Sequence, residues 1–231
     1  MKLQLNTKLT LKWVITYAIA MGFFEAAVVI YMRAYLYPQG FTFPLKPMAE
    51  VLLMVEVFRE AATIVMLVCV AVLAAKQKWQ RWGYFLIAFA VWDIFYYVFL
   101  KICINWPSSF LTWDVLFLIP ITWVGSVITP VIIAVMMIFL GYLLVAYNQK
   151  EHVPLPKLAK WLLLIGTLVC IIAFTIDYVK FLLVQPHLDF NLLASQYIPE
   201  QFYWSIYFLG VGLLFTGIIT YIRQKQKMKL L

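Results

Sequence analysis

Charged side chains lie inside stretches of this sequence that are otherwise apolar. A charge at the centre of a membrane helix costs about 2.5–3.5 kcal/mol on insertion scales, so such residues persist only where they face one another or water. They are therefore the first candidates for a ligand- or proton-binding site. Together with one tyrosine that shares their spacing, the candidates are Glu25, Glu56, Arg59, Glu60, Asp93, Tyr97, Lys101, Asp177 and Lys180.

The EVFREAAT run places several of these side chains on one face of a helix. Glu56, Glu60 and Thr63 follow the spacing i, i+4, i+7, and Arg59 lies beside them. A carboxylate pair with an adjacent guanidinium is a combination that can bind a polar ligand or a proton.

Two later runs repeat this arrangement. Asp93, Tyr97 and Lys101 follow one another at one-turn spacing, and Asp177 and Lys180 are three residues apart. Residues three and four apart are neighbours on a helix surface. Each run therefore predicts one polar stripe on an apolar helix.

The first apolar run carries a stripe of small residues at Ala18, Gly22 and Ala26. Such a stripe admits a close helix neighbour. Glu25 follows Gly22 by three residues, so we expect it to point into the bundle. Counted at 1.5 Å per residue, the charged rows of all the helices reach similar depths. We therefore expect one polar funnel that opens outwards and closes near mid-membrane.

In a functional interpretation, the funnel binds a ligand or a proton. The responsive acids are then Glu25, Glu60 and Asp93, and Arg59 and Lys101 are their counter-charges. Desolvation raises the pKa of a carboxylate and a nearby guanidinium lowers it, so such acids can titrate in a useful range.

A structural interpretation stays open beside it. Five acids face four bases when Arg33, at the outer end of the first run, is counted. This nearly neutral count suits ion pairs that only hold the helices in register. In that case Glu60 and Asp93 would pair with Arg59 or Lys101, and breaking a pair would destabilise the fold.

Several chemistries lack the residues they need. The chain has two histidines, His152 and His187, which predicts no haem and no zinc or copper site. A Ser-His-Asp hydrolase would have to use His187, and no motif accompanies it. The three cysteines are scattered and odd in number. We therefore expect no cofactor and no metal.

Composition excludes two broad classes of protein. The chain has 231 residues, of which 65% are hydrophobic and 12% charged. A soluble domain is about 45–50% apolar and about 25% charged. The net charge of +8 lies mostly in short segments between apolar runs and at the chain ends, which favours a membrane protein and not a nucleic-acid partner.

The elements that position the charged residues are apolar runs long enough to cross a bilayer. About 20 apolar residues span roughly 30 Å of hydrocarbon. The sequence predicts an all-α, polytopic bundle of six transmembrane helices in a single domain. The predicted spans are 13–33, 51–75, 82–104, 126–147, 161–184 and 202–222.

Lysine and arginine set the expected orientation, because cytoplasmic loops carry an excess of both. One side of the predicted bundle holds 13 of the 18 basic residues, at the two chain ends and in the loops around Lys78 and Lys157. The split alternates through all six spans. We therefore expect both termini in the cytoplasm, in the inner membrane of a bacterium.

One stretch does not fit a simple span. Val115–Gln149 is 35 residues without a charge, about 52 Å as a helix, which is too long for one crossing and too short for two. Pro120 and Pro130 can break or kink it. We predict an interfacial or re-entrant segment at 111–125 before the fourth span.

Three classes of function stay open. The favoured one is a transporter or ligand-binding membrane protein for a small polar or amphiphilic molecule. The alternatives are a non-catalytic subunit that assembles with other membrane subunits, and an intramembrane enzyme with a carboxylate base for a lipid-linked substrate. The small size and the lack of soluble domains favour a chain that is not an enzyme.

Overall fold

The computed structural model describes residues 3–149, 152–184 and 195–230. Its helices are α1 (Leu5–Leu36), α2 (Glu50–Ala74), α3 (Lys78–Ile104), α4 (Ile128–Tyr147), α5 (Lys157–Val184) and α7 (Trp204–Leu230). Six helices in these ranges are long and apolar enough to cross a membrane, judged by length and composition. The chain is therefore a helical, multi-pass membrane protein, as its apolar runs predict.

The helices extend beyond several of the predicted spans. α1 begins at Leu5 and not near residue 13, and α7 continues to Leu230 and not only to residue 222. α3 and α5 each begin about one turn before the predicted start. Hydropathy marks only the part of a helix that matches the hydrocarbon, whereas backbone hydrogen bonding continues into the polar ends.

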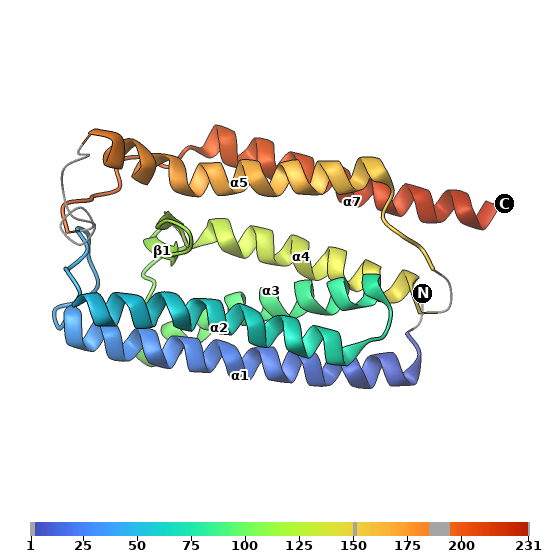
Figure 1. Ribbon diagram of the computed structural model, residues 1–231, viewed down its shortest axis with the longest axis horizontal. Coiled ribbons are helices and arrows are strands. Elements are labelled where there is room, and N and C mark those ends of the chain that lie inside the picture. The colour runs from blue at the N-terminus through green and yellow to red at the C-terminus, as the bar shows by residue number, and fades with distance from the viewer. Residues whose placement is uncertain (1–2, 150–151, 185–194, 231) are drawn as a thin grey trace.

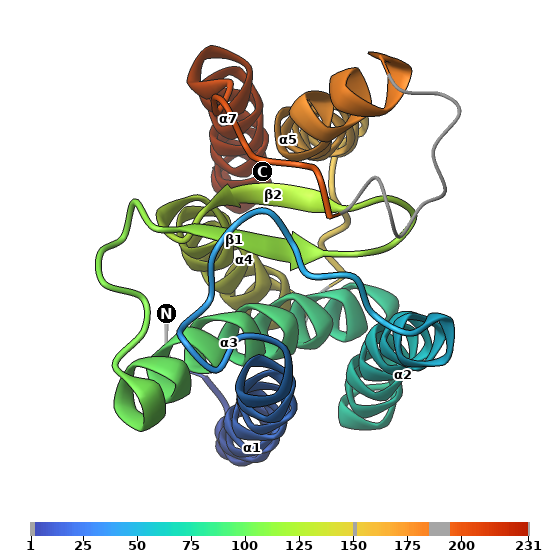
Figure 2. The same cartoon turned by 90° about the vertical axis from the view of Figure 1, so that its left-hand side faces the viewer.

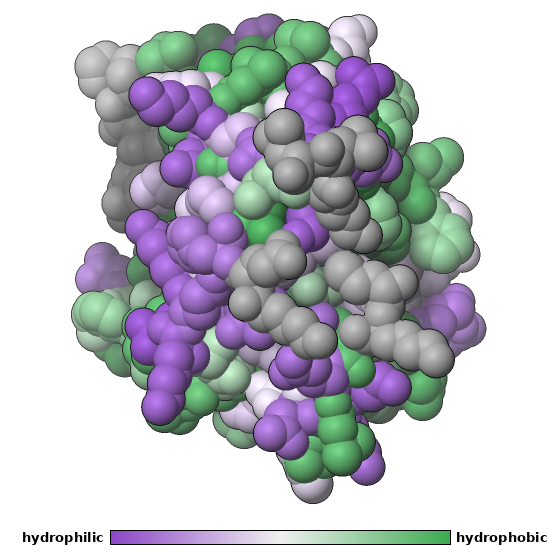
Figure 3. Space-filling view, turned by 90° about the vertical axis from the view of Figure 1, so that its right-hand side faces the viewer, coloured by the Kyte–Doolittle hydropathy of each residue, from purple (hydrophilic) through white to green (hydrophobic). Residues whose placement is uncertain are grey.

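Apolar side chains cover the outside of the bundle and charged ones lie inside it, which is the reverse of the arrangement in a soluble protein. On α2 the outward face is apolar, with Phe58, Val65 and Leu73 all exposed, whereas Glu56 and Glu60 are buried. The charged groups are thus withheld from the surface that lipid would cover. Hydrophilic side chains gather at the end of the bundle that carries the chain termini (Figure 3).

The helices form two layers. α3 packs against α1, α2 and α4, while α5 and α7 lie side by side as a separate pair (Figures 1 and 2). The pair contacts the rest of the molecule through α4 and the short strand β2, and the Tyr207 hydroxyl of α7 donates to the Thr129 carbonyl of α4 (2.8 Å). The two layers therefore meet along a narrow seam.

The absence of a side chain at Gly22 brings α1 against α3. A Cβ at this position would lie 2.9 Å from the Trp92 carbonyl oxygen and 2.9 Å from the Phe95 Cβ. The small-residue stripe of the first helix is thus a contact face, as its spacing predicts. Because Glu25 is the next turn along, this contact also sets its position relative to α3.

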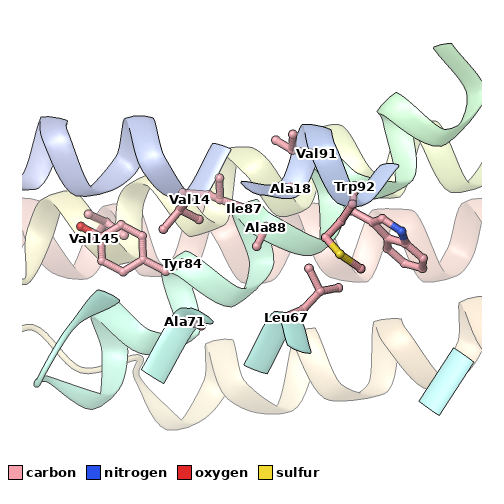
Figure 4. Close-up of a cluster of buried hydrophobic side chains, with 11 residues drawn as sticks. Val14, Ala18, Leu67, Ala71, Tyr84, Ile87, Ala88, Val91, Trp92 and Val145 are labelled. Carbon is pink, nitrogen blue, oxygen red and sulfur yellow. The ribbon is translucent and has the colours of Figure 1, made fainter. Parts of the chain in front are cut away.

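An apolar core fills the space between α1, α2, α3 and α4 (Figure 4). Ala18, Leu67 and Ala88 are fully buried within it. Trp92 lies at one end of this cluster. Because Trp92 also lines the cavity that contains the charged side chains, the apolar core ends next to them.

A two-stranded antiparallel hairpin lies between α3 and α4. It consists of β1 (Trp113–Phe117) and β2 (Trp123–Ser126), with Asp114 opposite Gly125. The hairpin lies at the end of the bundle opposite the termini, between the two layers, and the 37–49 connection passes over it (Figure 2). We call this the hairpin end. The segment predicted at 111–125 is thus a hairpin ahead of a single helix, and its placement in the membrane interface stays a prediction.

Candidate functional site

A cavity of about 160 Å³ lies at the hairpin end, between α1, α2, α3 and β1. Its wall also includes the 37–49 connection, where it reaches the exposed Lys46 and Pro47. One water occupies about 30 Å³ in the liquid, so the space suits about five waters or a small ligand. The polar side chains along it are Glu25, Arg33, Tyr37, Lys46, Glu56, Arg59, Glu60, Asp93, Tyr96, Tyr97, Asp114 and Thr122.

Arg59 holds two of the acids. Its Nε donates to Glu56 Oε2 (2.9 Å) and its Nη2 pairs with Glu56 Oε1, one turn earlier on α2. Its Nη1 pairs with Glu25 Oε2 of α1. Both carboxylates are buried. This triad joins α1 to α2, and its members are each other's partners, which is the behaviour of a structural ion-pair network.

Glu60 is held differently. It is buried on α2 and its Oε2 accepts from the backbone N–H of Leu118, in the hairpin turn, at 3.0 Å. Among the described residues it forms no ion pair, although Arg59 is its neighbour in sequence. The Glu60 carboxylate therefore ties α2 to the hairpin without a cation to balance its charge.

Among the acids of the cavity, Asp93 makes the fewest polar contacts with described residues. It lies on α3 and lines the cavity, and no described residue forms a hydrogen bond or ion pair with its carboxylate. Lys101, two turns along α3, donates instead to the Pro107 carbonyl (3.0 Å). The structural interpretation required Glu60 or Asp93 to pair with Arg59 or Lys101. Among the described residues, no such pair is formed.

The rim of the cavity carries a second ion pair. Arg33 Nη2 of α1 is 2.9 Å from Asp114 Oδ1 of β1, and the Tyr97 hydroxyl donates to Asp114 Oδ2 (3.3 Å). The guanidinium carbon lies 3.8 Å from the ring centroid of Trp106 and 4.4 Å from that of Phe41. The cation is thus enclosed by two aromatic faces and a carboxylate.

Asp114 lies outside the membrane helices and is only 1% exposed. Burial raises its pKa to about 6, and the Arg33 guanidinium and the Tyr97 hydroxyl limit this rise. The carboxyl that holds Arg33 in place therefore gains a proton at mildly acidic pH.

The structure brings six of the nine predicted site residues to this cavity. These six are Glu25, Glu56, Arg59, Glu60, Asp93 and Tyr97. The other three lie elsewhere, so the single funnel that we expected from helix depth does not contain all nine. Depth along a helix says nothing about which way each face turns, and α5 lies in the other layer.

Asp177 and Lys180 of α5 contact tyrosines of the segment before α7. Asp177 Oδ2 accepts from the Tyr197 hydroxyl (2.8 Å), and Lys180 Nζ donates to the Tyr203 hydroxyl (2.7 Å). Lys101 and Lys180 are both exposed. These side chains stabilise the hairpin end of the molecule outside the cavity.

Sequence reasoning missed Asp114. It is the only Asp, Glu, Lys or Arg between Lys101 and Lys150, and that isolation in an apolar stretch was the available signal. Arg33 was noted as a base but was not placed in the site. Nothing in helix periodicity links the two residues, because Asp114 lies on a strand.

The polar groups of the cavity are carboxylates, guanidiniums, hydroxyls and one ammonium. Within the described ranges, no group of three or more His, Cys, Asp or Glu side chains is placed to hold a metal ion. What the cavity offers is two guanidiniums in ion pairs, two acids without a cation, and aromatic walls. Comparison with protein-family models, curated protein sequences and solved structures finds no match for this chain, so its function has to be inferred from the cavity itself.

Proposed function

We propose that this protein binds a small polar or amphiphilic molecule in the cavity at the hairpin end, and transports it or presents it at the membrane. The observation behind the proposal is the Asp93 carboxylate, which lines the cavity without a partner among the described residues. Asp93 is half-buried. A carboxylate inside a membrane helix without a counter-charge is costly, so its presence there favours a ligand that supplies the missing partner.

In this proposal, both termini face the cytoplasm and the cavity opens to the opposite side of a bacterial inner membrane. The basic residues support that orientation, because 13 of the 18 fall in the chain ends and the two connections that the sequence assigns to the cytoplasmic side. The hairpin then lies at the outer interface. Its two tryptophans, Trp113 and Trp123, suit the headgroup level.

Cysteine labelling tests the orientation. The three native cysteines are first replaced by alanine. In that background, the Pro44→Cys variant should react with an impermeant maleimide in intact cells. The Lys78→Cys variant should react only after the cells are opened. Labelling at Lys78 from outside would reverse the orientation.

A ligand screen tests the function. The purified chain in lipid nanodiscs is screened by thermal unfolding against small organic cations, anions and zwitterions. We expect one class to raise the unfolding temperature of the wild type and of Asp177→Asn, whose acid lies outside the cavity, but not of Asp93→Asn.

The same screen separates the alternatives. If no ligand stabilises the protein and the isolated chain is unstable without co-purified partners, a subunit of a larger membrane complex is the better interpretation. Turnover of a lipid-linked substrate by the purified chain, lost in Asp93→Asn, would instead indicate an enzyme with a carboxylate base.

A further inference from the structure

A second cavity lies next to the first, on the other side of α3. It has a volume of about 310 Å³ and is lined by α3, the hairpin, α4, α5 and Leu214 of α7. Apart from Asp93 and Thr167, its walls are apolar or aromatic, with Ile133, Ala134 and Phe174 among them. It lies at the seam between the two layers of the bundle.

The two cavities share a wall. Trp92, Asp93, Leu116 and Phe117 line both of them. The charged cavity and the apolar cavity are therefore adjacent compartments, and Asp93 lies at their junction. A molecule that occupied both would place a polar group near Asp93 and an apolar group between α4 and α5.

Trp92 provides a second, independent sign of an absent partner at this junction. Its side chain is only 7% exposed, and its indole N–H is buried with no hydrogen-bond partner among the described residues. Buried polar groups are nearly always hydrogen-bonded. The indole N–H requires an acceptor and the Asp93 carboxylate requires a donor, so both residues indicate a bound group at this wall. An ammonium group supplies only the donor, so the indole N–H needs its acceptor from another part of the ligand or from water.

The charges determine which head group fits. The cavity has five carboxylates against three cationic side chains, Arg33, Arg59 and the exposed Lys46. The observed ion pairs leave Glu60 and Asp93 without a cation. An anionic head group would add to this excess of negative charge. A cationic one would reduce it, and Tyr96 and Tyr97, which line the same cavity, are aromatic rings of the kind that attract a cation.

We propose that the ligand is an amphiphilic cation whose ammonium group binds at Asp93 and whose hydrocarbon chain occupies the apolar cavity between α3, α4 and α5. This inference rests on the proposed function and names the class of ligand. An apolar cavity of about 150 Å³ holds benzene, so the second cavity has room for roughly twice that group, on the scale of an octyl chain.

The test compares three probes with the same chain, namely octylammonium, octanol and octanoate. Each is titrated calorimetrically into the wild-type protein in lipid nanodiscs, and the heat of partitioning into empty nanodiscs is subtracted. We expect octylammonium to bind and the other two to bind at least about tenfold more weakly, since a hydrogen bond to a charged group is worth this much or more.

Two variants locate the site. Asp93→Asn should weaken the binding of octylammonium about tenfold or more and leave the binding of octanol unchanged. Ala134→Leu fills part of the apolar cavity, so it should weaken the binding of octylammonium but not that of the shorter probe ethylammonium. Asp177→Asn is the matched control and should bind octylammonium as the wild type does. Circular dichroism and thermal unfolding establish that each variant is folded.

Every outcome decides between the proposals. Octylammonium binding that depends on both Asp93 and Ala134 supports this inference. If octanol or octanoate binds the wild type as tightly as octylammonium, the inference is overturned while the proposed binding function stands. If none of the three binds, this inference is overturned, whereas the proposed function is overturned only if the wider ligand screen also finds nothing that stabilises the protein. The comparison of probes uses only the wild type, so it holds even if Asp93→Asn does not fold.

Discussion

Two groups of charged side chains occupy the two layers of the bundle, and they differ in what they contact. In the layer of α1, α2 and α3, Arg59 joins acids from two helices and Arg33 reaches Asp114 on the hairpin. In the layer of α5 and α7, Asp177 and Lys180 bond to the segment before α7, through the Tyr197 and Tyr203 hydroxyls and the Glu200 backbone N–H. The same residue types at helical spacing thus line a cavity in one layer and fasten a neighbouring segment in the other.

The two layers differ in which elements face their charged helices. Each charged face of α1, α2 and α3 meets another charged face, because Gly22 draws α1 onto α3 and the hairpin closes the end of the bundle. α5 packs against α7, whose described face toward it is apolar around Tyr207 and Leu214. Charge on a membrane helix therefore marks a site only where a second polar element faces it.

The largest expected effect comes from removing the cation of the first layer. Arg59→Met leaves Glu25 and Glu56 buried without a counter-charge, and it should lower the free energy of unfolding by about 3–5 kcal/mol. The equivalent change in the second layer, Lys180→Met, should cost less than about 0.5 kcal/mol because that side chain is exposed. Unfolding in detergent with increasing dodecyl sulfate measures both.

A rescue experiment sharpens this result. Adding Glu25→Gln and Glu56→Gln to Arg59→Met removes the stranded charges, so most of the lost stability should return. Equal losses for Arg59→Met and Lys180→Met would contradict the distinction between the two layers.

The next effect is a dependence on pH that comes from Asp114. Burial raises its pKa from 3.8 to about 6, so the folded protein keeps this proton to a higher pH than the unfolded chain. The stability from this group is therefore present below about pH 4 and is lost as the pH rises through about 6. At about 1.4 kcal/mol per pKa unit, the change is at most about 3 kcal/mol.

Replacement of the carboxyl isolates this contribution. Asp114→Asn should lack that part of the decline in stability between about pH 4 and pH 6. Unfolding midpoints measured across this range report the difference. Identical profiles for wild type and Asp114→Asn would argue against a raised pKa at this position.

A smaller effect is expected at the contact that assembles the first layer. Gly22→Ala puts a methyl group against the Trp92 carbonyl and the Phe95 side chain, so it should cost about 1–3 kcal/mol. Gly212→Ala on α7 is the matched control, because a Cβ there meets nothing within 4 Å. Thermal unfolding should therefore separate the two glycines, and an unchanged midpoint for Gly22→Ala would show that α1 can move away from α3 at little cost.

The smallest predicted effect concerns the hydroxyl that supports Asp114. Tyr97→Phe removes its hydrogen bond to Asp114 Oδ2 and should cost about 0.5–1.5 kcal/mol. Tyr203→Phe removes the comparable bond to the exposed Lys180, and its effect should fall within about 0.5 kcal/mol. If the two losses were the same, burial at the cavity would not strengthen the polar contacts there.

The sequence alone determined the helical, membrane-spanning character of the chain and five of the eight charged residues that line the cavity. Apolar runs of sufficient length form helices in a bilayer, because every backbone polar group must be satisfied within the segment. Local spacing also identified Glu56, Arg59 and Glu60 as one polar face, and Gly22 as a point of close approach. These inferences needed only the geometry of one helix at a time.

Only the tertiary structure decided which charges meet. Periodicity places a side chain on a face but does not say what lies opposite, so Lys101, Asp177 and Lys180 looked equivalent to the residues of the cavity. The hairpin, which brings Asp114 to Arg33 and the Leu118 N–H to Glu60, depends on contacts between segments far apart in the chain. Pairing across such distances is set by the packing of whole elements, and no short stretch of sequence encodes it.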